Sequence, residues 1–413
     1  MVVVGASIAG IRSAEALRRR GYEGALHLIG AEQVPPYRRP ALSKRFLAAE
    51  LEWSGMALGQ AELDAEVLLG TRATRLDLAG RCLWLRTGGT TSDVRLAFDG
   101  LVIATGADAR RLPFPNNLDG VHVLRTLADA ERIRGELTVG ARIVVLGGGF
   151  VGCEVAATCR GLGLDVTVVE ADATLMGRVL GSRVGAFLTE LHRQNGTRVV
   201  LSATATELRG EDRVEAVALA DGTMLPADVV VVGIGVVPAT NWLNGSGIPL
   251  ADGVVCRPNL AVVGTDRVTA AGDVARWPHP TGGGLIRVEH WDNAVRQGDT
   301  AARTLLEGPG APAFSDVTMF WSEQYDVKIQ ILGYPAATDE FQVLEGDLAS
   351  GPCVAAFGRD GQVSAVLLIG CPQRIAAYQP LVRRRGRFPV EPSMPGSFAV
   401  RRDEHEPDHV ALG

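Results

Sequence analysis

The chain of 413 residues is long enough for two or three domains, each with its own hydrophobic core. With 46% hydrophobic and 21% charged residues and a net charge of −6, it has neither the composition of a disordered protein nor the basic balance of a nucleic-acid-binding protein. The six cysteines show no metal-ligand spacing, so we expect free thiols in a reducing compartment and no metal site. The sequence has no recognisable signal peptide and no apolar stretch of about 20 residues, and we therefore expect a cytoplasmic protein without a membrane partner.

The first predicted unit is a buried strand at residues 2–4, a tight turn and a helix over residues 11–20. Small residues let the backbone of such a turn approach a pyrophosphate, which the amide groups at the helix N-terminus attract. Glu32 follows the next predicted strand, at residues 25–30, where an acid can bind a ribose hydroxyl group. The unit predicts a dinucleotide site, and a turn that serves packing alone is the alternative. Its fingerprint residues, with serine in place of the usual second glycine, are Gly5, Ser7 and Gly10.

A second unit begins with a predicted strand at residues 143–146 and continues in a helix to about residue 162. The strand at residues 165–170 follows and ends at Glu170. Because a carboxylate accepts from a ribose 2′-hydroxyl and repels a 2′-phosphate, we predict NADH here, with NADPH less favoured. A ligand-free glycine turn is the alternative. The turn carries the complete dinucleotide-binding fingerprint: Gly147, Gly149 and Gly152.

Other segments complete the predicted order of elements. Residues 67–95 alternate like a small antiparallel meander, and residues 101–106 resemble another buried strand. The apolar run at residues 228–235 also ends in glycines and is a third candidate nucleotide site, although no helix follows it. From about residue 312 the pattern predicts strands and one or two helices, and a polar tail starts near residue 401. We predict an α/β fold with two Rossmann-like dinucleotide-binding domains and a C-terminal α+β domain.

Lysine is nearly absent, because only Lys44 and Lys328 among the 41 basic residues are lysine. A lysine kept against this bias can supply a compact charge with a tunable pKa, which arginine cannot. We interpret Lys44 as functional and Lys328, within a predicted strand, as retained by chance. His290 is either a proton relay or, as we favour, a structural histidine.

From residue 1 to about residue 392 the chain resembles the FAD-dependent NADH:ferredoxin reductases, whose architecture is that of the pyridine nucleotide-disulphide oxidoreductases. The resemblance implies an FAD-binding domain formed by residues 1–108 and 238–312, an NAD-binding domain at residues 109–237, a C-terminal domain at residues 313–397 that covers the flavin, and a tail at residues 398–413. The segments that carry it are VVVGASIAG at 2–10, PYRRPALSK at 36–44, ATG at 104–106, the Gly147 motif with Glu154, GIGVVP at 233–238, AGD at 271–273 and FWSEQY at 320–325.

The resemblance also implies residue roles. Lys44 falls near the flavin N5 and pairs with Glu154, and these two are the expected catalytic residues. The ADP part of FAD would lie against the first fingerprint, with Glu32, Ala73 and Arg125 nearby. The expected cofactor-binding residues are Lys44 together with Gly5, Ser7, Gly10, Glu32, Ala73, Ala104, Thr105, Gly106, Arg125, Gly147, Gly149, Gly152, Glu170, Gly235, Gly272, Asp273, Trp291 and Trp321.

Disulphide reductases of similar architecture carry a cysteine pair early in the chain, but residues 1–81 contain no cysteine. Electrons must then pass to an external acceptor, for which the resemblance implies a [2Fe–2S] ferredoxin, commonly acidic, that serves a cytochrome P450 or a dioxygenase. The protein would act as a monomer or a dimer. Two other functions stay open: an NADH oxidase or reductase of rubredoxin or quinones, and an NADH-sensing flavoprotein whose turnover is incidental.

Overall fold

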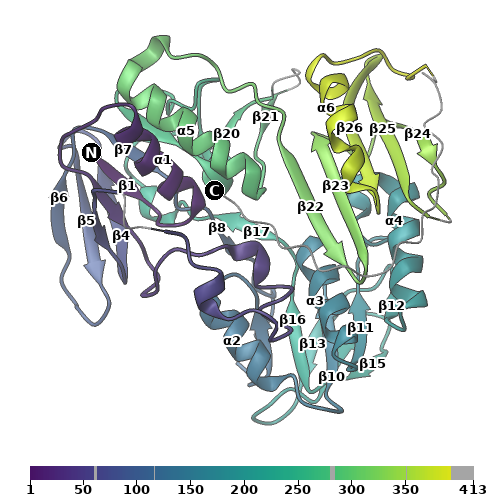
Figure 1. Ribbon diagram of the computed structural model, residues 1–413. Coiled ribbons are helices and arrows are strands. Elements are labelled where there is room, and N and C mark those ends of the chain that lie inside the picture. Colours follow the sequence, from purple (N-terminus) through teal and green to yellow (C-terminus); the bar gives the residue numbers. More distant parts are fainter. Residues whose placement is uncertain (60–62, 116, 280–283, 350, 392–413) are drawn as a thin grey trace.

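The computed structural model describes residues 1–59, 63–115, 117–279, 284–349 and 351–391, and it consists of three parts, each built on its own five-stranded sheet (Figure 1). The first sheet is parallel, with the strand order β19-β7-β1-β2-β3. Its central strands are apolar and buried, as a sheet covered on both faces requires. The strands are β1 (Val2–Val4), β2 (His27–Ile29), β3 (Glu66–Leu68), β7 (Leu101–Ile103) and β19 (Val268–Ala270).

The second sheet is also parallel and has the equivalent order β12-β11-β10-β16-β9. The apolar run at residues 228–235 forms β16, which pairs with β10 at the centre of this sheet. The run is therefore a central strand of the second unit and does not begin a third strand-turn-helix unit. The strands are β9 (Val121–Val123), β10 (Arg142–Leu146), β11 (Asp165–Val169), β12 (Arg198–Val200) and β16 (Val229–Val232).

In both units the chain forms a separate three-stranded antiparallel sheet at the equivalent point between two strands of the parallel sheet. The first confirms the predicted meander from residue 71 on, whereas residues 67 and 68 belong to β3 in the parallel sheet. The matching insertions show that the two units share one topology. The strands of these two antiparallel sheets are β4 (Thr71–Asp77), β5 (Cys82–Thr87) and β6 (Val94–Ala97), and β13 (Ala205–Arg209), β14 (Ala216–Leu219) and β15 (Met224–Pro226).

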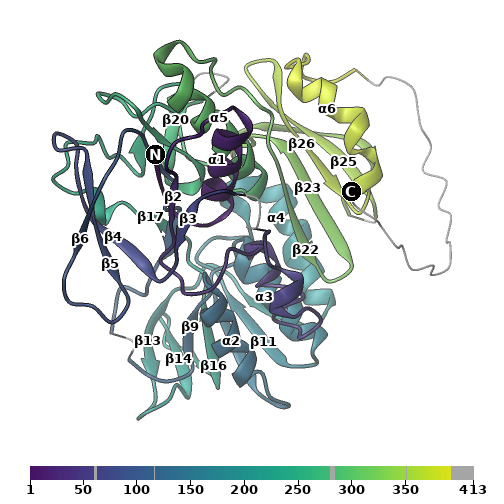
Figure 2. The same ribbon diagram turned by 60° about the vertical axis from the view of Figure 1, so that its left-hand side comes forward.

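Helices cover the parallel sheets (Figure 2). In the first unit α1 packs closely on α5, where a Cβ atom on Gly298 would collide with the carbonyl oxygen of Ala9. Only glycine permits this approach of the two helices. The helices are α1 (Ile8–Arg19), α2 (Leu127–Glu136), α3 (Phe150–Gly161), α4 (Gly177–Gln194, with a kink at Gly181), α5 (Trp291–Glu307) and α6 (Ile375–Arg383).

The chain passes from the first part to the second and back through one two-stranded antiparallel ribbon. β8 (Ala107–Ala109) pairs with β17 (Val236–Pro238), and the backbone N–H of Ala239 donates to the carbonyl oxygen of Gly106 at 3.0 Å. The outgoing and returning segments are therefore adjacent. A small sheet of β18 (Val254–Val255), β20 (Ala275–Pro278) and β21 (Leu285–Ile286) completes the first part.

The third part is an antiparallel sheet, β22-β23-β26-β25-β24, that carries α6. Its edge strand β22 packs on α3, and one hydrophobic cluster runs from the second sheet through α3 into β22 and β23. The predicted α/β fold with a C-terminal α+β domain is confirmed, while the tail predicted from residue 398 lies outside the described residues. The strands are β22 (Met319–Gln324), β23 (Val327–Gly333), β24 (Glu340–Gly346), β25 (Cys353–Arg359) and β26 (Gln362–Ile369).

Candidate functional site

A cavity of about 390 Å³ lies where the strands of the first sheet end. Its walls include the residues that follow β1, β2, β7 and β19, together with parts of α3, α5 and β22. In an open parallel sheet this carboxyl edge is where ligands bind. Fourteen of the predicted site residues line it: Gly5, Ser7, Glu32, Lys44, Ala73, Ala104, Thr105, Gly106, Arg125, Glu154, Gly272, Asp273, Trp291 and Trp321.

The turn after β1 shows why the first fingerprint needs small residues. Gly5 has a φ of +117°, and a Cβ atom on it would overlap the carbonyl oxygen of Ala104 on the neighbouring strand. Gly10 lies behind the turn against Gly5, so it does not line the cavity. Ser7 is the N-cap of α1, its side chain caps no backbone group, and the first turn of α1 contains no acidic residue. The positive end of α1 is therefore free to attract an anion.

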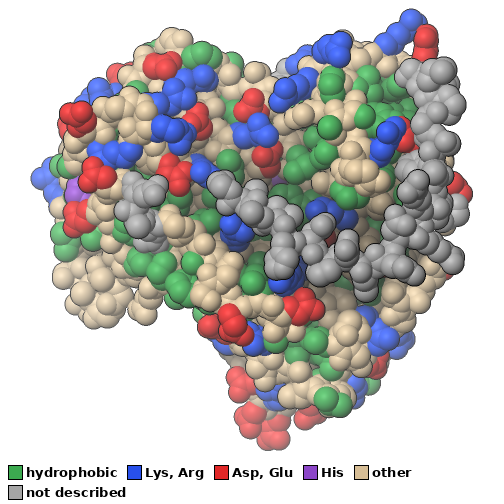
Figure 3. Space-filling view, viewed as in Figure 1, with side chains coloured by type: hydrophobic (Ala, Val, Ile, Leu, Met, Phe, Trp, Pro, Cys, Tyr) green, Lys and Arg blue, Asp and Glu red, His purple; other side chains and the backbone are tan. Residues whose placement is uncertain are grey.

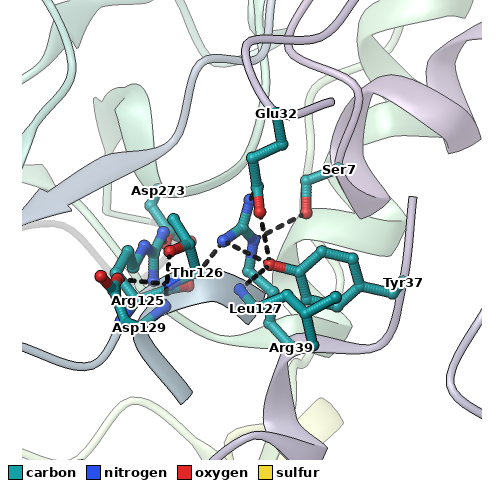
Figure 4. Close-up of polar contacts among 9 residues, drawn as sticks. All are labelled: Ser7, Glu32, Tyr37, Arg39, Arg125, Thr126, Leu127, Asp129 and Asp273. Atoms are coloured by element: carbon teal, nitrogen blue, oxygen red, sulfur yellow. Dashed lines mark hydrogen bonds and ion pairs between the residues drawn. The ribbon is translucent and has the colours of Figure 1, made fainter. Parts of the chain in front are cut away.

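A polar cluster on the cavity wall is centred on Arg39 (Figure 4). The guanidinium of Arg39 pairs with Glu32 and donates to the carbonyl oxygen of Arg125 at 2.6 Å, while the hydroxyl of Tyr37 donates to Glu32 at 2.7 Å. Burial opposes the charge of Arg39, but Tyr37 and Glu32 outweigh it and raise the pKa of the guanidinium. Glu32, predicted to bind ribose, is thus held in place by two neighbours.

Figure 4 also shows a second ion pair, between Arg125 and Asp273, at 2.8 Å. Both residues line the cavity, although Asp273 follows β19 and Arg125 precedes α2. The pair joins segments 148 residues apart. The structure thus brings these two predicted residues together.

Lys44 and Glu154, the two expected catalytic residues, form an ion pair of 2.7 Å between Nζ and Oε2. The Lys44 Nζ also donates to the carbonyl oxygen of Pro40 at 3.0 Å. Glu154 is only 5% exposed and accepts from the hydroxyl of Ser43 at 2.5 Å and from that of Ser322 at 2.8 Å. A buried carboxylate of this kind is stable because every contact donates to it. The ammonium group is fixed at the cavity wall.

Aromatic residues close the same side of the cavity. Trp291 begins α5 and Trp321 lies in β22, while His290 stacks on Phe320 with ring centroids 4.0 Å apart. Burial lowers the pKa of His290 to about 4, so the ring is neutral at physiological pH.

The second fingerprint lies outside this cavity, at the carboxyl edge of the second sheet. Gly147 has a φ of +104° and packs against Gly233, and Gly152 packs against Gly147, which repeats the arrangement of the first turn. A Cβ atom on Gly149, the N-cap of α3, would meet no described atom within 4 Å, so the helix N-terminus is open.

Glu170 directly follows β11 and lies beside this second turn. Its carboxylate accepts from the backbone N–H of Gly148 at 2.6 Å and from that of Asp172 at 2.8 Å. The structure therefore places Glu170 next to the turn, as the sequence predicts for a ribose-binding acid. Gly235 lies after β16 with a φ of +95° and does not line the cavity at the first sheet.

Sequence reasoning missed the polar residues that hold the predicted ones. Ser43 and Ser322 donate to Glu154, and Tyr37 and Arg39 hold Glu32. A signal for Ser322 exists: along β22 every second residue is buried, and Ser322 falls on the buried side. A polar side chain at a buried strand position requires a partner.

The cysteines and Lys328 do not line the cavity. The six cysteines are free and buried, and burial raises the pKa of Cys153 and, to about 12, that of Cys159. Lys328 is half-exposed and lies 3.9 Å from Glu323. The described residues do not group three or more His, Cys, Asp or Glu side chains as metal ligands. None of the helices within the described part has the length and apolar character that crossing a membrane requires.

Comparisons with known proteins cover nearly the whole chain. Residues 1–298 match the family model described as pyridine nucleotide-disulphide oxidoreductase, and residues 319–402 match that described as reductase C-terminal. The chain is 39% identical to the biphenyl dioxygenase system ferredoxin–NAD(+) reductase component of Paraburkholderia xenovorans, over 93% of each chain. It is 36% identical to rhodocoxin reductase of Rhodococcus erythropolis, over 85% of this chain and 82% of that one.

Two solved structures are also similar. The covalent putidaredoxin reductase–putidaredoxin complex matches with a TM-score of 0.86 and 30% identity, over 93% of each chain. The ferredoxin reductase for the CYP199A2 system from Rhodopseudomonas palustris matches with a TM-score of 0.87 and 32% identity, over 95% of this chain and 96% of that one. These matches confirm the resemblance and the fold predicted from the sequence.

Proposed function

This chain belongs to the pyridine nucleotide-disulphide oxidoreductase family, and on that premise we propose that it is a ferredoxin–NAD(+) reductase that supplies electrons to an oxygenase. The observation that carries the proposal is the Lys44–Glu154 pair at the wall of a cavity whose described lining contains no cysteine. Without a cysteine pair beside the site, electrons leave to an external acceptor. Relatives named as ferredoxin reductase components of dioxygenase systems support the same conclusion.

The cavity fits FAD. The N-terminus of α1 presents free amide groups beside a turn that only small residues permit, which suits a pyrophosphate. The buried Nδ1 atom of His290, on the cavity wall, has no hydrogen-bond partner among the described residues. When bound, FAD supplies the chemistry of accepting a hydride and releasing its two electrons singly.

The residues proposed to hold FAD divide by position along the cavity. Gly5 and Ser7 form the turn for the pyrophosphate, Gly10 lets α1 pack against this turn, and Glu32 is the ribose acceptor. Ala73, Ala104, Thr105 and Gly106 line the same wall. Arg125 and Gly272 would also contact FAD, Asp273 would bind the ribityl chain, and Trp291 and Trp321 would pack along the flavin ring.

Lys44 is the proposed electrostatic catalyst. Its ammonium group is held by Glu154 and by the Pro40 carbonyl, so it requires no reorganisation during reaction. A fixed cation of this kind stabilises negative charge that develops at the cavity. Glu154 keeps the ammonium group oriented when no nicotinamide is present.

NADH is the proposed electron donor. Gly147, Gly149 and Gly152 would bind its pyrophosphate at the N-terminus of α3, with Gly235 nearby. Glu170 and Asp172 give this end of β11 a negative balance, although Arg178 pairs with Asp172 at 2.6 Å. A carboxylate at this position accepts from a ribose hydroxyl and disfavours a 2′-phosphate.

The proposed acceptor is a [2Fe–2S] ferredoxin. The decisive experiment measures NADH-dependent cytochrome c reduction by the purified FAD-loaded protein, with and without added ferredoxins of that class, and with NADPH in parallel. We expect a large rate that requires both NADH and ferredoxin.

Other outcomes would redirect the proposal. A rate that no ferredoxin changes, with fast oxygen or quinone reduction, would identify an oxidase or quinone reductase. Slow turnover with every carrier, together with a long-lived reduced complex with NAD and a change in oligomeric state, would identify an NADH-sensing protein.

A further inference from the structure

We infer that a buried chain of hydrogen bonds, running from Thr197 to Glu154, positions the carboxylate that holds Lys44, and that Ser322 is its key positioning residue. The inference rests on the proposed role of Lys44 beside FAD. The positioning chain consists of six side chains: Thr197, Tyr325, His192, Gln324, Ser322 and Glu154.

The contacts are continuous. The hydroxyl oxygens of Thr197 and Tyr325 are 2.8 Å apart, and Tyr325 Oη lies 3.0 Å from His192 Nδ1. His192 Nε2 lies 3.1 Å from Gln324 Oε1, whose amide nitrogen donates to Ser322 Oγ at 3.1 Å. Ser322 then donates to Glu154 Oε1 at 2.8 Å. Glu154 Oε2 is left for Ser43 and Lys44.

The direction of each bond follows from chemistry. The Gln324 amide nitrogen faces Ser322 Oγ and the sulfur of Met176 at 3.5 Å, so Oε1 faces His192 as an acceptor. Burial lowers the pKa of His192 to about 4, so the ring is neutral. Its proton must then be on Nε2, which leaves Nδ1 to accept from Tyr325.

These directions end on the carboxylate. Because Ser322 accepts from Gln324, its own proton is committed to Glu154. An amide does not relay protons readily, so the chain orients groups rather than conducting a proton. Directed hydrogen bonds in a low-dielectric interior reinforce one another. The carboxylate is therefore pinned at Oε1 by the chain and at Oε2 by Ser43 and Lys44.

The members come from separate parts of the molecule. Glu154 lies on α3, His192 on the last turn of α4, and Ser322 and Gln324 on β22 of the C-terminal sheet. The lower end of β22 meets α3 and α4 in Figure 1. His192, Ser322 and Gln324 are 0% exposed. The position of the C-terminal sheet against α3 and α4 thus controls the orientation of the Glu154 carboxylate at the cofactor cavity.

The test uses the FAD-loaded full chain. Ser322→Ala should lower the rate constant of flavin reduction by NADH on the order of tenfold, the effect of one hydrogen bond to a charged group. The affinity for NADH should stay nearly unchanged, because Ser322 does not lie at the second fingerprint. The midpoint potential of FAD, measured by dithionite titration, should become more negative, and Ser322→Thr should restore both properties.

The matched control is Ser13→Ala, which removes another fully buried serine whose hydroxyl donates to the Ala9 carbonyl at 2.8 Å. It should change neither rate nor potential. Tyr325→Phe, at the partly exposed end, should act like Ser322→Ala but more weakly, and it decides the question if Ser322→Ala does not fold.

The inference is overturned if Ser322→Ala, or Tyr325→Phe in its place, keeps the wild-type rate and potential. It is also overturned if Ser13→Ala lowers the rate and the potential equally. The potential needs neither NADH nor ferredoxin. If the potential falls in Ser322→Ala but ferredoxin does not change the rate of the wild-type protein, the proposed function is rejected and the inference about the positioning chain is kept.

Discussion

At the scale of single residues, Lys44 illustrates what a rare residue type can indicate. Nearly all basic residues of the sequence are arginine, and one of the two lysines is partly buried against Glu154 while the other is half-exposed. Arginine at position 44 would spread its charge over a wider fork and would not fit the same contacts. Composition thus pointed to the residue, but Ser43 and Ser322, which donate to its partner Glu154, emerged only from the fold.

Lys44→Ala should lower the rate of flavin reduction by NADH by about 10²–10³, the usual cost of removing one preorganised charge. Stopped-flow absorbance under anaerobic conditions measures it. Lys328→Ala, which removes the other lysine, serves as the control and should reduce at the wild-type rate. Equal rates in Lys44→Ala and wild type would contradict the proposed role.

Glu170→Gln should weaken the discrimination against NADPH by on the order of tenfold, which corresponds to about 1.4 kcal/mol. The substitution preserves an oxygen for the Gly148 N–H but removes the negative charge. Steady-state kcat/KM for both nucleotides gives the ratio. An unchanged ratio would mean that another residue selects the nucleotide.

His192 predicts a pH dependence of stability. Its pKa is about 4 in the folded protein and about 6.5 when unfolded, so the unfolded chain binds more protons between these values. The contribution of neutral His192 to the free energy of unfolding is complete above pH 6.5. It is lost as the pH falls toward 4, by about 2 kcal/mol at pH 5. Tm should therefore fall between pH 7.5 and 5.0, and it should fall less in His192→Gln. An equal fall in both proteins would contradict this origin.

At the scale of elements, the sequence predicted each strand-turn-helix unit because glycine spacing and apolar strands are local signals. The order of strands was not predictable. In the chain, β9 comes before all other strands of its sheet, whereas β19, at the equivalent position, comes after all other strands of its sheet. The positioning chain was equally hidden, because His192 and Gln324 are 132 residues apart. Local patterns specify elements, whereas pairings between distant segments depend on the whole packing.

Within α3, two glycines allow a matched comparison. A Cβ atom on Gly152 would overlap the Gly147 carbonyl, whereas one on Gly161 would meet no described atom within 4 Å. Gly152→Ala should push α3 from the turn and weaken NAD⁺ binding by tenfold or more, on the order of 1.4 kcal/mol, with FAD content unchanged. Gly161→Ala should bind NAD⁺ normally and be stabilised by about 0.5–1 kcal/mol, because Gly161 lies in α3 without a positive φ. Titration calorimetry measures the NAD⁺ affinity of both variants, and equal affinities would contradict the prediction.

At the scale of the whole molecule, the net charge of −6 cannot attract an acidic ferredoxin. Acidic and basic side chains are interspersed over the face in Figure 3, which also shows a notch between the part with α1 and α5 and the part with α6. Attraction must then come from local arginine groups, among which Arg383, Arg384 and Arg387 are exposed. Local charges act over about 10 Å at 0.1 M salt.

The ferredoxin-dependent rate should therefore fall several-fold as the salt concentration rises from about 20 to 300 mM. Cytochrome c reduction at limiting ferredoxin measures this rate. Reduction of a neutral quinone is the control, because it involves no charged partner and should stay nearly constant. A ferredoxin-dependent rate that is flat across this range would exclude electrostatic steering.

The ribbon of β8 and β17 brings the two ends of the second part of the molecule together. Ala107 and Pro238 face each other across the ribbon, and the Thr105 hydroxyl donates to the Ala239 carbonyl at 2.9 Å. The two ends of the second part are therefore adjacent, and a short turn can join them without moving the first sheet. An exchanged insert that recognises a different electron donor would have to keep Arg125, Phe150 and Glu154, because these residues of the second part also line the cavity at the first sheet.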